Sequence, residues 1–261
     1  MGRKANRSET RTPDIGLSGV AVRGFKSIRN ETRVEIRPLT ILAGANSTGK
    51  SSIIQPLLLL KQTLEVPYDP GPLCLDGPNV RFTRAEQFLW AGANGIRDGE
   101  FSVELKHDTI FMIRICFKAR EGEGVAMEWL RFRETGRIKE VHPMMSHEEV
   151  VAVMPRDWRG IEDLRSKAKK MRPASWALVW QRWLFMYADG ASGTVLGTPA
   201  EVNIFDSDLR RMIHLPALRG NPERSYRKSG SGYGFPGLFQ DYAASIVLCW
   251  FSLNPTVGVR S

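Results

Sequence analysis

Polar and apolar residues alternate along several short stretches near the start of the chain, a pattern typical of strands with one buried face. Residues 19–25 predict a first strand, and residues 33–37 predict a second one after a turn at 26–30. The short apolar run from Leu39 to Ala43 predicts a third strand. Residues 51–62 are apolar at most positions and predict a mostly buried helix. The chain is therefore expected to open with strands and to enter a helix after the third.

Residues 101–142 predict an antiparallel meander. Within one run, Ile113 and Ile115 alternate with Arg114 and Lys118, which predicts a buried face and a wetter face. The strand-like runs are rich in β-branched and aromatic residues and are separated by short polar breaks; they cover residues 101–105, 109–118 and 125–133.

After Pro155 the pattern becomes helical. Residues 161–171 are highly charged, and the run from Trp176 to Tyr187 carries aromatic side chains at helical spacing. A basic helix beside an aromatic one could contact nucleic acid, but core packing explains such aromatics more often. Asp206-Ser207-Asp208 could be a metal-binding pair of carboxylates, but Asp206 or Ser207 is read as a helix cap instead.

One segment carries a specific chemical signature. Residues 44–51 match the phosphate-loop pattern G-x-x-x-x-G-K-[ST], between the predicted third strand and the predicted helix. Glycines let backbone N–H groups approach a phosphate, at the positive end of the following helix. Lys50 supplies a positive charge for the β- and γ-phosphates, and the Ser51 hydroxyl is placed to bind Mg²⁺. The expected nucleotide-binding residues are Gly44, Ala45, Asn46, Ser47, Thr48, Gly49, Lys50, Ser51 and Ser52.

A second glycine pattern is weaker. Residues 232–237 spell G-x-G-x-x-G, but no strand precedes them and Pro236 interrupts them, so a loop before a helix at 238–250 is expected. The four histidines show no metal-ligand spacing. Ser51 of the phosphate loop is therefore the one expected metal ligand, for Mg²⁺.

The composition indicates a positive net charge and suggests in which cellular compartment the protein lies. The chain has 261 residues and a formal charge of +9, concentrated in residues 1–60 and 151–261. This balance favours phosphate-bearing partners, DNA included. Three widely spaced cysteines suggest reduced thiols. No apolar run is long enough for a membrane span and the N-terminus lacks an apolar signal core, so we expect a cytoplasmic protein with no membrane partner.

The stretches Val22-Arg23-Gly24-Phe25-Lys26-Ser27-Ile28 and Leu39 to Ser52 resemble the opening of RecF/OLD-like AAA ATPases, in the ABC/SMC class of P-loop proteins. Residues 213–224 also look like a segment of one bacterial branch of AAA-type ATPases. The resemblance implies a mixed α/β (α+β) fold: an ABC-type head with an antiparallel β meander and a helical insertion. It implies ATP and Mg²⁺ as cofactors, and many family members act on DNA in repair or phage defence.

The resemblance also implies parts that the chain lacks. Such ATPases need an L-S-G-G-like signature segment and an apolar strand ending in Asp-Glu, and neither pattern occurs between Ser52 and Ser261. We therefore expect the N-terminal part of an ATPase that binds ATP but does not hydrolyse it as an isolated chain. The expected partners are a second head in a head-to-head homodimer, a chain supplying the second half, or DNA.

The expected organisation is a basic tail at 1–16, an ATPase lobe with the antiparallel subdomain at 17–155, and a helical region at 156–261. Two alternatives stay open: a DNA-associated binding subunit and a non-catalytic remnant. A small P-loop kinase or GTPase is disfavoured, because no N-K-x-D motif is present and antiparallel strands precede the phosphate loop.

Overall fold

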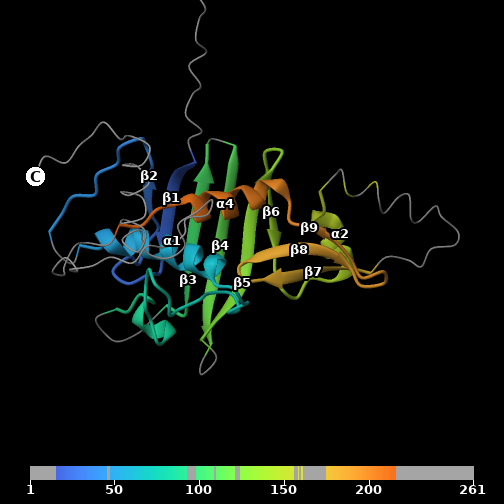
Figure 1. The fold of residues 1–261 in the computed structure, drawn as a ribbon, viewed down its shortest axis with the longest axis horizontal. Helices are drawn as coiled ribbons and strands as arrows, with labels where there is room; N and C mark the ends of the chain where they lie inside the picture. The colour runs from blue at the N-terminus through green and yellow to red at the C-terminus, as the bar shows by residue number, and fades with distance from the viewer. Residues whose placement is uncertain are drawn as a thin grey trace, which may run out of the picture.

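The computed structural model describes residues 16–45, 48–92, 98–108, 110–120, 124–155, 158, 160 and 175–215. Its largest element is a six-stranded antiparallel sheet in the order β2-β1-β3-β4-β5-β6 (Figure 1). The strands are β1 (Leu17–Arg23), β2 (Thr32–Glu35), β3 (Glu100–His107), β4 (Phe111–Arg120), β5 (Gly124–Glu134) and β6 (Arg137–Val141). The first and second predicted strands and the predicted meander are thus confirmed as parts of one continuous sheet.

The alternation along β4 explains how the sheet separates its two faces. Ile113, Ile115 and Phe117 are fully buried, whereas Arg114 is half-buried and Lys118 is exposed on the opposite face. Burying a side chain of this size stabilises a fold by about 1.5–3 kcal/mol. The apolar face of the sheet therefore forms the core, as the sequence pattern predicted.

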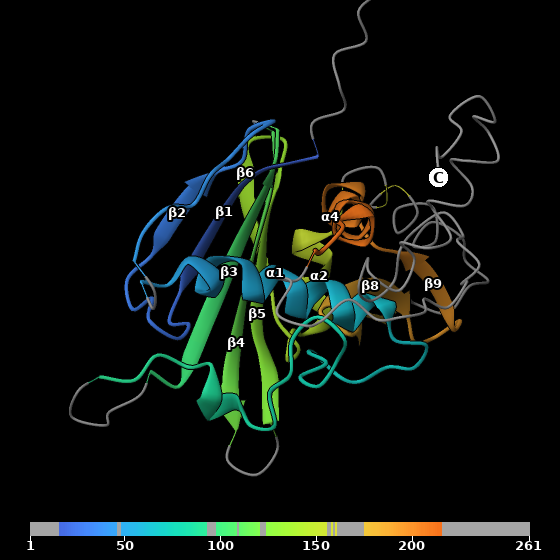
Figure 2. The same cartoon turned by 60° about the vertical axis from the view of Figure 1, so that its left-hand side comes forward.

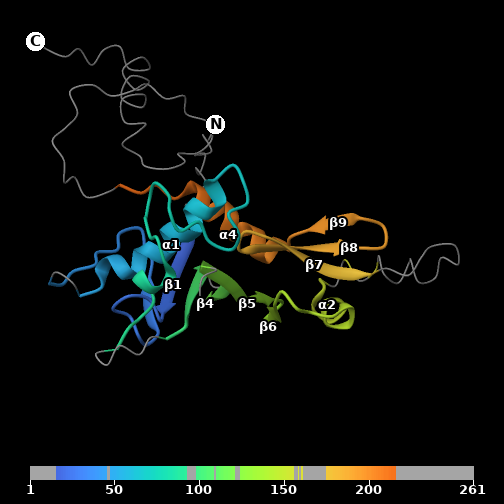
Figure 3. The same cartoon turned by 90° about the horizontal axis from the view of Figure 1, so that it is seen from below.

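Two helices cover the apolar face. Helix α1 (Lys50–Glu65) and helix α4 (Ala200–Arg211) contact each other and lie on the same side of the sheet (Figures 2 and 3). The middle of α1 is apolar all round, and Leu57 to Leu60 are all buried. The predicted helix at 51–62 is confirmed and is longer by a residue at its start and three at its end.

The region after Pro155 contains a second sheet where a helix was predicted. Strands β7 (Trp176–Gln181), β8 (Leu184–Asp189) and β9 (Thr194–Gly197) form an antiparallel sheet beside helix α2 (His147–Val153). The helix prediction for Trp176 to Tyr187 is therefore wrong. A tight turn in which Arg182 has a φ of 60° interrupts the run, and the aromatic residues lie on the two arms of a hairpin.

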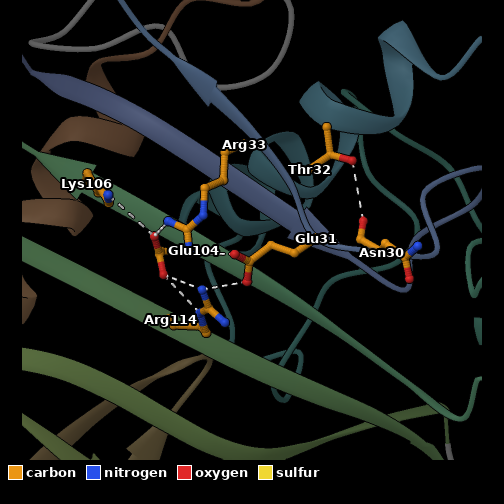
Figure 4. A network of polar contacts seen from close by, with 7 residues as sticks. All are labelled: Asn30, Glu31, Thr32, Arg33, Glu104, Lys106 and Arg114. Carbon is orange, nitrogen blue, oxygen red and sulfur yellow. Dashed lines mark hydrogen bonds and ion pairs between the residues drawn. The ribbon is translucent and has the colours of Figure 1, made fainter.

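The opposite face of the main sheet carries a charged network (Figure 4). The carboxylate of Glu104 is almost buried and lies 2.7 Å from Arg33 Nη1 and 2.5 Å from Arg114 Nη2. Arg114 also reaches Glu31 at 2.7 Å. Burial raises the pKa of Glu31, but the nearby Arg114 and Arg33 outweigh it and hold this pKa below its usual value. The network links β2 to β3 and β4 across β1, because its members come from β3, β4 and the start of β2.

Two further predictions are corrected. Leu39 to Ala43 form no strand: Leu39 and Ile41 are 78% and 77% exposed, and no described strand pairs with them. Asp206 and Ser207 do not cap a helix, because α4 begins at Ala200 and Pro199 holds its N-cap position. Asp206 instead pairs with Arg210 one turn later.

Other predictions have mixed outcomes. The turn at 26–30 is confirmed by backbone hydrogen bonds between Phe25 and Ile28. Cys74 and Cys116 are free and buried, as expected for reduced thiols. The tail at 1–15, the charged helix at 161–171, the G-x-G-x-x-G segment, Cys249 and the helix at 238–250 lie outside the described residues.

Candidate functional site

The phosphate-loop glycines hold backbone shapes that few other residues adopt. Gly49 has a φ of 94° and a ψ of 10°, in the left-handed region, and it immediately precedes α1. A Cβ on Gly49 would lie 2.6 Å from Ser27 Oγ, and a Cβ on Gly44 would lie 2.9 Å from Thr48 Oγ1. The loop therefore needs glycine at both positions, for backbone angle and for space.

The start of α1 is left open for an anion. Because a glycine holds the N-cap position, no side chain caps the helix, and the first turn carries no acidic residue. The first N–H groups of a helix have no partner within the helix, and the aligned peptide dipoles make this end positive. A phosphate placed there would satisfy these donors.

Side chains of the loop fold back onto its carbonyl groups. Lys50 Nζ donates to the carbonyl oxygens of Gly44 at 2.7 Å and Ala45 at 2.5 Å. Thr48 Oγ1 donates to the same Ala45 oxygen at 2.9 Å. These bonds hold the ammonium group of Lys50 beside the carbonyl groups of Gly44 and Ala45, where it can contact a phosphate.

A residue from the turn after β1 also belongs to the site. Ser27 Oγ lies 3.3 Å from Ser52 Oγ on the first turn of α1 and, as noted, close to Gly49. In the sequence, Ser27 stands out only within the stretch that resembles a family, and it has no predicted role. The contact links residues 25 positions apart in sequence, and the K-S pair before the second strand was its only sequence signal.

The expected metal ligand is accessible. Ser51 is exposed on the first turn of α1, and a hydroxyl there is a suitable oxygen ligand for Mg²⁺ beside a bound phosphate. No group of three or more His, Cys, Asp or Glu side chains that could hold a metal occurs in the described part of the chain. The Ser51 hydroxyl therefore fits a Mg²⁺ ion that would also bind the phosphates of a nucleotide.

The remaining predicted residues lie in one short segment. Gly44, Ala45 and Thr48 are exposed, and Ser52 is buried against the turn after β1. Asn46 and Ser47 lie outside the described residues.

A hollow of about 960 Å³ lies apart from the loop, over β1–β3, and its lining mixes equal numbers of basic and acidic side chains. The phosphate loop thus remains the candidate site with a clear chemical signature.

No helix in the described part of the chain is long and apolar enough to cross a membrane. A search among curated proteins found no match. A protein-family model described as an AAA ATPase domain matches residues 16–171, which include the phosphate loop, α1 and strands β1 to β6. On this evidence the chain belongs to the AAA ATPase domain family.

Proposed function

We propose that this protein binds ATP together with Mg²⁺ at residues 44–52. The backbone N–H groups of the loop and of the first turn of α1 would hold the β- and γ-phosphates, and Lys50 would neutralise part of their charge. Ser51 would supply one oxygen ligand to Mg²⁺, which stabilises the negative charge on the phosphate oxygens when bound. Family membership supports ATP binding.

The geometry of the loop is the observation that carries this proposal. A simple strand-to-helix turn has no need for an ammonium group bonded to two loop carbonyls at the uncapped end of a helix. Lys50 also has no carboxylate partner among the described residues, so its charge is available to an anionic ligand.

At a finer level we propose a RecF/OLD-like head of the ABC/SMC class acting in the cytoplasm, with a role in DNA repair or phage defence. The resemblance of residues 22–28 and 39–52 supports this subtype. A second chain, either another copy or one supplying an acidic strand, would complete the site for hydrolysis. The exposure of Leu39 and Ile41 beside the loop is consistent with a surface that such a chain covers.

A Lys50→Ala variant tests nucleotide binding. Removing a charge-assisted contact to phosphate costs about 1.5–3 kcal/mol, so we expect ATP affinity to fall by roughly 10- to 150-fold. Isothermal titration with Mg²⁺-ATP measures the change. Lys106→Ala is the matched control, because this lysine lies on the opposite face of the sheet, 3.8 Å from Glu104. Equal affinity of wild type and Lys50→Ala would refute the proposal.

DNA binding is the second candidate function, supported by the formal charge of +9. Phosphate contacts release counterions, so the affinity for a DNA duplex should fall steeply as salt concentration rises. Fluorescence anisotropy of a labelled duplex across a salt series measures this dependence. A signal that does not change with salt would argue against a DNA-associated role.

A further inference from the structure

Two segments far apart in sequence, residues 24–29 and 88–90, are joined by backbone hydrogen bonds beside the phosphate loop; we call them the wall. Lys26 N donates to Phe88 O at 2.7 Å, and Trp90 N donates to Gly24 O at 2.8 Å. These bonds join the turn after β1 to the segment that follows the short helix η1 (Ala85–Gln87). Ser27, in the same turn, contacts the start of α1. The wall therefore runs from the phosphate loop through the turn to Trp90.

The far end of this wall carries an arginine stacked on a tryptophan. The guanidinium carbon of Arg29 lies 4.4 Å from the centre of the Trp90 ring. Arg29 is exposed and Trp90 is half-buried. Such a contact holds the flat guanidinium group over the ring, at a place that solvent and ligands can reach.

A second pair of the same kind shows what is special about Arg29. Arg131 lies 4.1 Å from the ring centre of Trp129, but its Nε also donates to Glu140 at 2.6 Å. The charge of Arg131 is thus neutralised within the sheet. No carboxylate in the described residues forms an ion pair with Arg29, so its charge and its plane stay available to a ligand.

The short stretch of chain between Ser27 and Arg29 suits the length of a nucleotide. Arg29 is two residues beyond Ser27, a span of at most about 7 Å along the chain. Ser27 in turn borders Gly49 and Ser52 at the end of α1 where phosphates would bind. A ribose and base extending from those phosphates along the wall would reach the Arg29 side chain.

We propose that the Arg29–Trp90 pair is the platform on which the base of the bound nucleotide stacks. This inference rests on the proposed nucleotide binding and adds the position and type of base recognition. Bases stack on guanidinium planes as they do on aromatic rings, and such stacking tolerates different bases because each has a flat π-face. The platform therefore predicts similar affinities for ATP and GTP, and weaker binding of inorganic triphosphate.

Binding of Mg²⁺-ATP, Mg²⁺-GTP and Mg²⁺-triphosphate to Arg29→Ala and Arg29→Lys tests the platform. Stacking contributes about 1–3 kcal/mol per base, so both variants should bind ATP about tenfold more weakly. The lysine variant keeps the charge and loses the plane, which separates stacking from simple attraction. Triphosphate affinity should be unchanged in Arg29→Lys. Arg131→Ala, which disrupts the matched pair on the sheet, should leave all three affinities unchanged.

The outcomes separate this inference from the function it rests on. Full ATP affinity in Arg29→Lys, or an equal loss of ATP and triphosphate affinity in Arg29→Ala, would show that only charge matters and would overturn the platform. A strong preference for ATP over GTP would also overturn it, since edge recognition would then dominate. If Lys50-dependent binding persists in these cases, the proposed function stands. Absence of both ATP and triphosphate binding in wild type would remove both.

Discussion

Gly24→Ala is expected to lower the free energy of unfolding by about 3 kcal/mol, the sum of backbone strain and an overpacked contact. Gly24 has a φ of 74°, and a Cβ there would lie 2.5 Å from the carbonyl oxygen of Glu100 and 3.2 Å from Phe101 Cα. Both neighbours are backbone atoms of β3, so no side-chain rotation can relieve the clash. Urea denaturation followed by circular dichroism measures the loss.

The matched control for this change is Gly136→Ala. Gly136 has a φ of 80° in the turn between β5 and β6, and a Cβ there would have no heavy atom within 4 Å. This variant carries the backbone strain alone, about 1 kcal/mol. If both variants lost the same stability, close approach of β1 and β3 at Gly24 would not be limiting.

Gly24 also connects the fold to the site. Gly24 lies against β3 at the start of the turn that carries Ser27 and Arg29, and its carbonyl oxygen also accepts the hydrogen bond from Trp90 N. A shift of this turn would move Ser27 away from the start of α1. Weaker ATP binding is therefore expected to accompany the loss of stability in Gly24→Ala, but not in Gly136→Ala.

Local patterns in the sequence were sufficient for the strands of the main sheet and for α1. In β4 the core residues Ile113, Ile115 and Phe117 alternate with residues on the other face of the sheet, so a period of two appears directly in the residues. The phosphate loop was found for a similar reason, because its glycines, lysine and hydroxyls are consecutive. Features that depend only on neighbours along the chain are those that one sequence reveals.

The wrong predictions concern segments whose residue spacing fits both a helix and a strand, or segments whose structure depends on a pairing partner elsewhere in the chain. Trp176, Trp180, Trp183 and Tyr187 fit a helical spacing, yet Trp176 and Trp180 also lie on one side of β7, and Tyr187 lies on β8 after a turn. Trp183 is fully buried in the core, and its Nε1 donates to Leu60 O at 3.2 Å, a contact across 123 positions. Leu39 to Ala43 have the composition of a strand, but a strand requires a neighbour, which the residues themselves cannot specify.

The contact between Ser27 and Ser52 is a further example of the same limit. It exists because α1 packs on the sheet that contains β1, and the turn after β1 then meets the N-terminus of α1. Nothing within residues 24–30 alone indicates a neighbour on the helix. The pattern of the phosphate loop could thus be recognised in the sequence, whereas the contacts beside it required the fold.

Glu65→Ala is expected to be comparably destabilising, because it breaks a buried ion pair that helps α1 pack against α4. Lys61 is fully buried, pairs with Glu65 on the same helix and donates from Nζ to Arg210 O at 3.2 Å. Removing one partner of a buried pair costs about 3–5 kcal/mol, since the other charge stays in a medium of low polarity. Thermal and urea unfolding of the variant measure this loss.

The control replaces both charges at once. In the double variant Lys61→Met with Glu65→Leu, the desolvation cost of two charges disappears together with their attraction, so stability should stay within about 1 kcal/mol of wild type or rise. A double variant as unstable as Glu65→Ala would instead mean that the ion pair itself stabilises the α1–α4 contact. Because α1 begins at the phosphate loop, ATP affinity in both variants should follow the folded fraction and change no further once unfolding is corrected for.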